Sequence, residues 1–175
     1  MAETVYTVAP IPPDPEHTTY VDAGSVSFGI EYRLLDDAQL AANYQGADMD
    51  EIRGALQDKQ VQEVEDNGIS IHVIAKVDGH EYLRFDCFEN GPHYHYIEPS
   101  GEKQTIVDYD EGALGDMVEW TIDQLRTRLA EMLERAGGAT IAASLESARI
   151  EIGLTELAGL IDESRTRLAA ERRRS

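Results

Sequence analysis

Residues 67–109, NGISIHVIAKVDGHEYLRFDCFENGPHYHYIEPSGEKQTIVDY, decide the fold. Turn-forming dipeptides, each flanked by strand-like residues, divide this stretch: Asn67-Gly68, Asp78-Gly79 and Asn90-Gly91. Each pair favours a two-residue hairpin loop, because both of its positions tolerate a positive φ. A further turn follows at residues 99–102. The spacing predicts an antiparallel meander with strands at 69–77, 80–88, 93–98 and 103–109.

The sequence on either side of the meander predicts another strand and several helices. Apolar residues alternate from Val26 to Leu34, as in a half-buried strand. Short helices are expected at 36–44 and 48–57, the second with a capping box of Asp48 and Glu51. Beyond Leu114 the apolar spacing becomes helical. One helix ends at Gly137-Gly138, and another runs from about residue 140 into the tail with the stripe Ile150, Leu154, Leu157, Ile161 and Leu168.

These elements predict an α+β domain: an antiparallel β-meander of four to six strands with two C-terminal helices packed on one face. We divide the chain into three segments. Residues 1–24 are a Pro-rich extended N-terminal arm, since Pro10, Pro12, Pro13 and Pro15 forbid a helix. Residues 25–138 are the core domain with the meander and the first long helix. Residues 139–175 are a C-terminal helix that packs on the core or on a partner.

The charge of the chain excludes several function classes. Thirty-four acidic residues oppose 15 basic ones, for a net charge of -19. Such a surface repels nucleic acid and anionic membranes, so we expect neither as a partner. No basic leader with a long apolar core and no 18-residue apolar run occurs, which predicts a cytoplasmic, non-membrane protein. The single Cys87 excludes an internal disulfide and a cysteine-based metal knuckle.

The turns also predict the strand register. With two-residue loops at Asp78-Gly79 and Asn90-Gly91, residue 73 would face 84, residue 71 would face 86 and residue 86 would face 95. The loop at 99–102 sets His95 opposite Ile106 and His93 opposite Asp108. One face is then apolar and lies under the helices: Ile74, Leu83, Phe85, Cys87, Tyr94, Tyr96, Val107 and Tyr109. The open face carries Arg84, Asp86, His93, His95 and Asp108, bordered by Ile69, Ile71, Val73 and Phe88.

The polar cluster on the open face is the candidate site. His-x-His spacing puts both imidazoles on one side of a strand, and Asp86 and Asp108 would complete a set of metal ligands with His93 and His95. Such a set suits a divalent transition metal: zinc, iron or manganese. A metal-free alternative is a catalytic dyad of His95 and Asp86, with the imidazole as general base. The third alternative is a salt-bridged polar face without chemistry.

Residues 91–98, Gly-Pro-His-Tyr-His-Tyr-Ile-Glu, resemble the first metal motif of cupins, which has Gly, then His-x-His, then Glu. In this chain the Gly lies too close to the first His, the Glu comes early, and no second His-bearing motif follows. The chain also has too much helix after too few strands. We therefore do not assign it to the cupins.

The sequence favours a non-catalytic acidic binding or accessory protein that acts through protein–protein contacts, with a protein partner or as a homo-oligomer. Two features support this interpretation: the apolar stripe of the long last helix, and an acidic segment at residues 36–66 that suits a basic partner. The apolar residues that border the open face also need a cover. The alternative is a small metal-binding protein or metal-dependent enzyme that uses the His-x-His pair and the two carboxylates. A third hypothesis is an acidic mimic of nucleic acid, which requires carboxylates at phosphate-like spacing along one face.

Overall fold

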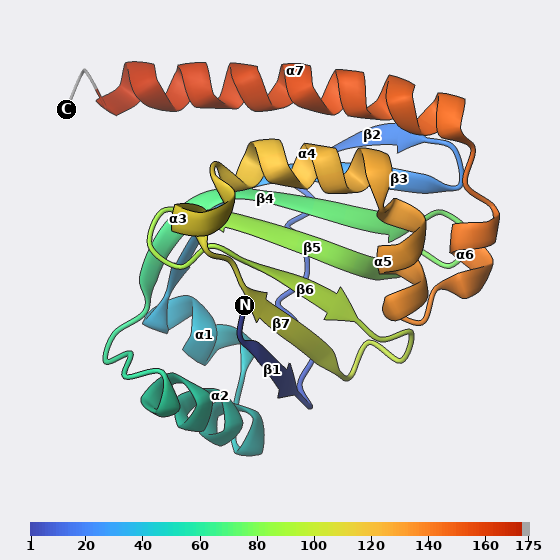
Figure 1. Cartoon of the computed structure of the whole chain (residues 1–175). Helices are drawn as coiled ribbons and strands as arrows, with labels where there is room; N and C mark the ends of the chain where they lie inside the picture. Colours follow the sequence, from blue (N-terminus) through green and yellow to red (C-terminus); the bar gives the residue numbers. More distant parts are fainter. Residues whose placement is uncertain (173–175) are drawn as a thin grey trace.

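The computed structural model describes the backbone of residues 1–172 and the side chains of residues 1–167. Its centre is a seven-stranded antiparallel sheet in the order β1-β7-β6-β5-β4-β3-β2 (Figure 1). The strands are β1 (Glu3–Tyr6), β2 (Thr19–Ala23), β3 (Val26–Asp36), β4 (Glu65–Ala75), β5 (Glu81–Phe88), β6 (His93–Ile97) and β7 (Gln104–Asp108). The four strands of the expected meander therefore lie side by side as β4 to β7.

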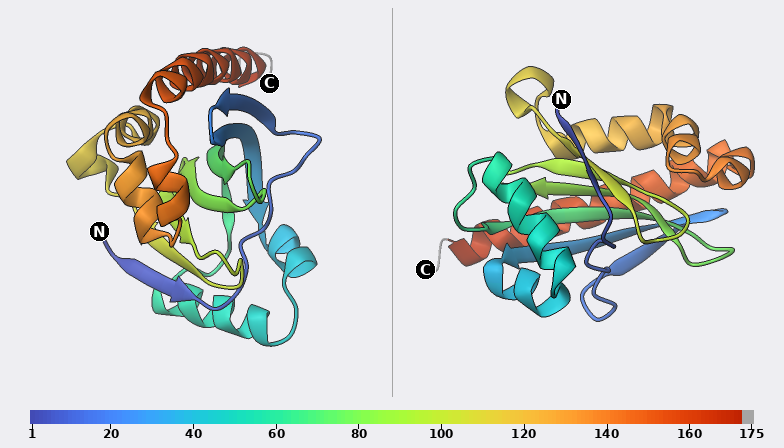
Figure 2. Two further views of the ribbon diagram at one scale, coloured as in Figure 1. Left: turned by 90° about the vertical axis from the view of Figure 1, so that its right-hand side faces the viewer. Right: turned by 90° about the horizontal axis from the view of Figure 1, so that it is seen from below.

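Helices cover the two faces of the sheet unequally. The described helices are α1 (Asp37–Asn43), α2 (Ala47–Asp58), α3 (Glu111–Leu114), α4 (Met117–Thr127), α5 (Leu129–Arg135), α6 (Ala139–Ala143) and α7 (Ser147–Arg172). Helices α4, α5 and α7 pack on one face, where they contact β2, β3 and β5. Helices α1 and α2 lie toward the other face, together with the N-terminal segment (Figure 2). None of the helices in the described part of the chain is long and apolar enough to cross a membrane.

The expected α+β class with an antiparallel sheet is confirmed, but the detail differs. The sheet has more than six strands, because residues at both ends of the segment 1–24 pair with its edges: β1 with β7, and β2 with β3. The prolines restrict only the middle of that segment. The first long helix is divided into α3, α4 and α5, and the side chains of Asp110 and Asp116 cap α3 and α4. The second, expected to run unbroken from about residue 140, is divided into α6 and α7. Leu168 of the predicted stripe lies outside the residues whose side chains are described.

The two short helices occur close to where they were expected, with one correction at a cap. The side chain of Asp36 accepts a hydrogen bond from the Gln39 amide and caps α1. The capping box of Asp48 and Glu51 is not formed. Helix α2 begins one residue earlier, after Gly46 at a φ of 59°, so Asp48 lies within the first turn.

The turn prediction is wrong for Asn67-Gly68, which lies inside β4 and pairs with β3 and β5. Gly68 has no room for a side chain there, since a Cβ would meet the carbonyl oxygen of Cys87 at 2.3 Å. The connection around Asp78-Gly79 is longer than two residues, and a bulge lies between Val73 and Ile74. The residue pairs along β4 and β5 therefore differ from the prediction.

This difference reverses the two faces of β4. Ser70 pairs with Asp86, and His72 pairs with Arg84. Ile69, Ile71 and Val73, expected on the open face, are buried in the main core instead. The register is displaced by one residue, and a displacement of one residue exchanges the faces of a strand.

The register of β5 with β6 is displaced by two residues, so the faces of these strands are kept. Asp86 pairs with His93, and Arg84 pairs with His95, because Asn90-Gly91 lies within a longer loop. The Asp66 carboxylate holds this loop by accepting hydrogen bonds from the amides of Asn90 and Gly91 at 3.0 and 2.6 Å. Between β6 and β7 the predicted pairs are found: His93 with Asp108, and His95 with Ile106.

The main core lies between the sheet and the C-terminal helices. Its fully buried members come from both layers: Phe28, Ile71, Leu83, Phe85, Leu125, Leu133, Leu154 and Leu157. A second, smaller cluster lies on the open side, where Tyr6, Val8 and Ile52 pack together. This separate cluster shows that the N-terminal segment and α2 cover part of the open face.

Candidate functional site

The open face of the sheet carries a row of buried polar side chains. They project from adjacent strands at alternating positions, because residues two apart share a face. The row comprises Glu31, Ser70, His72, Arg84, Asp86, His95 and Gln104, each less than 9% exposed. A buried polar group is unfavourable unless it is paired. The pairing divides the row into two groups, one around Arg84 and one around Asp86.

The first group is a network of ion pairs. Arg84 donates to both carboxylate oxygens of Glu81, at 2.9 and 2.5 Å. Arg33 pairs with Glu31 at 2.6 Å, and His72 lies between Glu81 and Glu31. Burial lowers the pKa of His72, but the carboxylates of Glu31 and Glu81 raise it by more. Each basic side chain of this group contacts a carboxylate within the group, which favours a structural role.

The N-terminal segment between β1 and β2 crosses this face (Figure 2). Arg33 donates to the carbonyl oxygens of Ile11 and Pro12, at 3.1 and 2.8 Å. The hydroxyl of Tyr44 donates to the carbonyl of Ala9 at 2.8 Å. The Pro-rich stretch is therefore fixed by hydrogen bonds to its backbone carbonyl groups.

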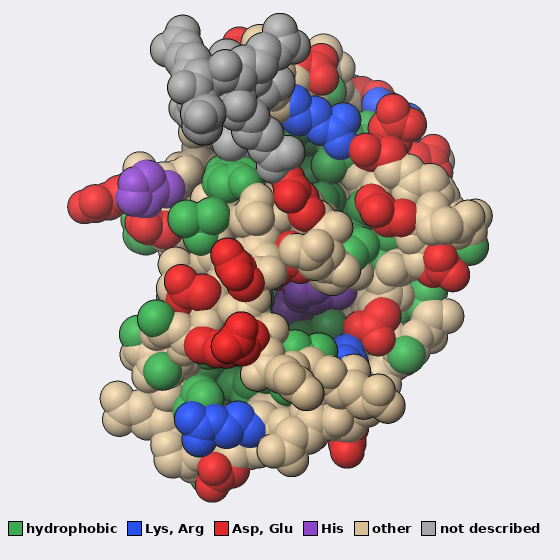
Figure 3. Space-filling model, turned by 90° about the vertical axis from the view of Figure 1, so that its left-hand side faces the viewer, with side chains coloured by type: hydrophobic (Ala, Val, Ile, Leu, Met, Phe, Trp, Pro, Cys, Tyr) green, Lys and Arg blue, Asp and Glu red, His purple; other side chains and the backbone are tan. Residues whose placement is uncertain are grey.

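A pocket of about 380 Å³ lies between the sheet, α1, α2 and the N-terminal segment. His93, His95, Asp86 and Arg84 contribute to its polar floor, and aliphatic side chains of α1 and α2 contribute to its wall. Figure 3 shows histidine side chains at the bottom of a hollow, with hydrophobic side chains inside it and acidic ones around it. Pockets of this volume commonly bind small molecules.

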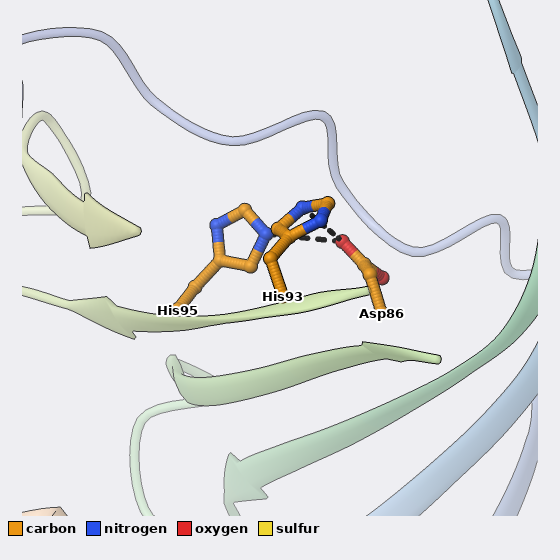
Figure 4. A group of neighbouring side chains, drawn as sticks. All are labelled: Asp86, His93 and His95. Carbon is orange, nitrogen blue, oxygen red and sulfur yellow. Dashed lines mark hydrogen bonds and ion pairs between the residues drawn. The ribbon is translucent and has the colours of Figure 1, made fainter. Parts of the chain in front are cut away.

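Asp86, His93 and His95 form the second polar group, at the floor of the pocket. Asp86 projects from β5, and the two imidazoles project from β6 toward its carboxylate (Figure 4). The Oδ2 atom of Asp86 lies 3.0 Å from His95 Nε2 and 3.4 Å from His93 Nε2. One atom from each of the three residues lies within 4.8 Å of the others, close enough to share one metal ion.

The remaining polar atoms of these three residues are held by fixed partners. His93 Nδ1 lies 2.7 Å from the carbonyl oxygen of Gly91, and His95 Nδ1 lies 2.7 Å from Gln104 Oε1. The amide of Gln104 is oriented by its other end, which donates to the carbonyl of Val8 at 3.1 Å. The hydroxyl of Ser70 donates to Asp86 Oδ1. Both imidazoles thus carry a proton on Nδ1, and both Nε2 atoms face Asp86.

The charges of the group are strongly coupled. Burial raises the pKa of Asp86, but hydrogen bonds with the two histidines lower it well below its usual value, so it is a carboxylate at neutral pH. Burial lowers the pKa of His93, and the carboxylate of Asp86 reverses this effect and raises it. The pKa of His95 is lowered, by burial and by the charges of His93 and Arg84. Without a metal, His93 is therefore the imidazole that takes a proton first.

Asp108, the fourth predicted ligand, lies apart from this group. Its carboxylate pairs with Lys59 at 2.7 Å and is about half exposed at the edge of the pocket. Sequence reasoning did not identify Ser70, His72 or Gln104 as part of the site. The sequence did contain a signal for Gln104. The register set by the loop at 99–102 places Ile106 opposite His95 on the open face, and Gln104, two residues earlier in the same strand, shares that face.

The comparisons with known proteins give a family. Neither the curated proteins nor the solved structures contain a significant match to this chain. A family described as Domain of unknown function (DUF7700) matches residues 20–161. The matched region includes Asp86, His93 and His95 and leaves out β1. On the extent of this match, the chain belongs to the DUF7700 family.

Proposed function

We propose that the protein binds a divalent transition metal through Asp86 Oδ2, His93 Nε2 and His95 Nε2, and that the metal binds a small molecule in the pocket. One observation carries the proposal: both imidazoles donate from Nδ1 to fixed acceptors, so both Nε2 atoms face the same carboxylate oxygen. With both rings neutral, two nitrogen lone pairs and a carboxylate would repel one another. A shared cation removes that repulsion.

The distances support a metal as this cation. Ligand atoms about 2.1 Å from a zinc-like ion lie roughly 3.0–3.4 Å from one another in octahedral or tetrahedral geometry. The two Nε2–Oδ2 distances are 3.0 and 3.4 Å. Histidines that bind metals usually donate their other ring nitrogen to a carbonyl or carboxylate, which fixes the tautomer. Gly91 and Gln104 supply such acceptors here.

The ligand set suggests which metals bind and what they do. Two imidazoles and one carboxylate suit zinc, iron or manganese. Three protein ligands leave coordination positions open, and the pocket lies next to them. A metal held in this way would polarise an oxygen of the bound molecule as a Lewis acid. Asp108 is not required in this proposal, because its carboxylate pairs with Lys59.

The metal-free dyad of Asp86 and His95 has less support. Both ring nitrogens of His95 contact protein groups, Gln104 Oε1 at 2.7 Å and Asp86 Oδ2 at 3.0 Å. Nδ1 already carries a proton, and the lone pair of Nε2 faces Asp86, so neither nitrogen faces a substrate as a general base must. The residue is also 5% exposed.

The interpretation as an acidic accessory protein loses one of its supports. Ile69, Ile71 and Val73 lie in the main core, so they do not need a partner to cover them. The net charge of -19 still favours a basic partner over an acidic one. The net charge does not indicate which surface would bind such a partner, whereas the metal proposal rests on three named ligand atoms.

Metal titration by calorimetry tests the proposal, with untagged protein that has been stripped of metal. We expect one Zn²⁺ or Mn²⁺ per chain. Replacing a ligand in His95→Ala or Asp86→Asn should weaken binding by more than about 100-fold. His17→Ala is the matched control, because His17 is exposed and is not among the residues that line the pocket. Absence of binding in the wild type, or equal binding by His95→Ala, would contradict the proposal.

A further inference from the structure

The wall of the pocket differs in chemistry from its floor. Leu40 of α1 and Ile52 and Leu56 of α2 line the side away from the sheet, and Phe88 and Ile106 line the sheet around the floor. Leu40, Ile52 and Phe88 are buried at 8%, 8% and 4% exposure. A ligand that fills the 380 Å³ must therefore place most of its surface against apolar side chains.

The floor has a positive charge once a metal is bound. A divalent ion adds two charges to the single negative charge of Asp86, while both histidines stay neutral as ligands. Glu63, Glu65 and Asp66 also line the pocket, whereas Arg84 pairs with Glu81 and Arg33 pairs with Glu31 near its floor. Lys59 and Asp108 pair in the same way at the edge. The metal and Asp86 together thus carry a net charge of about +1, and this is the charge that a ligand at the open metal positions meets.

Arg84 adds a directional donor to this floor. Its Nε and Nη2 atoms donate to Glu81, and within the described residues no hydrogen bond uses Nη1. The residue is 2% exposed, and it lines the pocket. A carboxylate accepts a hydrogen bond from a guanidinium with favourable geometry and charge.

On the basis of the proposed metal site, we propose that the ligand is a small monocarboxylate with an apolar chain. Its carboxylate lies on the floor, at the open positions of the metal and near Arg84. Its chain lies against the wall formed by Leu40, Ile52 and Leu56. Acetate and inorganic phosphate would leave this wall uncovered, and an alkylamine would oppose the positive floor.

Calorimetry with acetate, hexanoate and octanoate on the Zn²⁺-loaded chain tests this inference. Affinity should rise about fourfold for each methylene that enters the pocket. Octanoate should bind more tightly than octanol, and octylamine should bind least. Removing the metal should weaken octanoate binding at least tenfold and leave the order of chain lengths unchanged. Equal affinity for acetate and octanoate, or for octanoate and octylamine, would overturn the inference.

Two matched variants examine the wall. Leu56→Asn places a polar group in it and should weaken octanoate binding about tenfold or more, while Zn²⁺ binding stays as in the wild type. Leu114→Asn makes the same change at an exposed position of α3 that does not line the pocket, and should alter neither measurement. Equal octanoate affinity in these two variants would contradict the placement of the chain.

The metal and the ligand are measured separately, so the two proposals can fail separately. Zn²⁺ binding without octanoate binding would overturn the ligand inference and leave the proposed function intact. Octanoate binding that depends on chain length, in a chain that binds no metal, would contradict the proposed function. It would support the apolar wall, with Arg84 holding the carboxylate.

Discussion

Replacing Gln104 with Leu should affect both the stability of the fold and the affinity for metal. Gln104 is 3% exposed and joins two parts of the molecule. Its Oε1 accepts the proton of His95 Nδ1 at 2.7 Å, and its Nε2 donates to the carbonyl of Val8 at 3.1 Å. Leucine is apolar and one atom shorter, and it supplies neither group.

The cost to stability follows from the two groups that lose a partner. A buried polar group without a hydrogen bond costs roughly 1–3 kcal/mol. The ring N–H of His95 and the Val8 carbonyl each lose one partner, and the leucine side chain recovers part of the loss by its own burial. We expect Gln104→Leu to lower the free energy of unfolding of the metal-free protein by about 2–4 kcal/mol.

The effect on metal affinity follows from the tautomer of His95. Removing an outer partner of a ligating histidine typically weakens metal binding about 10–100-fold. Gln104→Glu keeps an acceptor for His95 Nδ1 and loses only the donor to Val8. This variant should therefore keep Zn²⁺ affinity near or above that of the wild type, while it also loses stability.

Urea unfolding and Zn²⁺ calorimetry on the same preparations measure both effects. Gln57→Leu, at an exposed position of α2, is the control for the change from amide to alkyl side chain. If Gln104→Leu unfolds like the control and binds Zn²⁺ as tightly as the wild type, the reasoning about the tautomer is refuted. If Gln104→Glu and Gln104→Leu lose the same amount of Zn²⁺ affinity, the hydrogen-bond acceptor for His95 Nδ1 does not determine that affinity.

Two further predictions concern the sheet and its charges. Gly68→Ala should cost about 1–3 kcal/mol in urea unfolding, since its Cβ would meet the Cys87 carbonyl oxygen at 2.3 Å. Gly54 is exposed in α2 and a Cβ there would have nothing within 4 Å, so Gly54→Ala should instead raise the free energy of unfolding by about 0.5–1 kcal/mol. A change of the same sign in both variants would contradict the close packing at Gly68. Burial raises the pKa of Glu81, but Arg84 and His72 lower it to about 2, well below the usual 4.5. The stability that this carboxylate contributes, on the order of 3 kcal/mol, is complete above about pH 4.5 and is lost as the pH falls toward 2. Glu81→Gln should flatten the fall of the unfolding free energy across that range, and an unchanged slope would show that Glu81 does not cause it.

The sequence alone was enough to predict the order of most elements. Alternation in residues 26–34 and in the stretch 80–109 predicts strands, because side chains on a pleated strand alternate between its faces. The loop at 99–102 correctly set His95 opposite Ile106 and His93 opposite Asp108. The approach of His93 and His95 to Asp86 could be anticipated as well, since a displacement of two residues leaves all three on the same face.

Other features were decided only by tertiary structure. The bulge near Val73 places Ile71 under the helices and His72 on the open face, because burying the apolar side of β4 outweighs the local preference for a short turn. The prolines of the N-terminal segment predict an extended chain but do not predict where it lies. Its backbone carbonyl groups accept hydrogen bonds from the side chains of Arg33 and Gln104, which lie 22 and 96 residues from their acceptors in the sequence.

The sequence by itself determined the strand pattern and the pair of histidines on one side of a strand. Both depend on the period of two residues in a strand, which is local. The tertiary structure alone decided the tautomer of His95, the apolar wall above the site and the pairing of Asp108 with Lys59. Each of these depends on contacts between residues far apart in the chain, whose positions are fixed only when the helices and the N-terminal segment pack on the sheet.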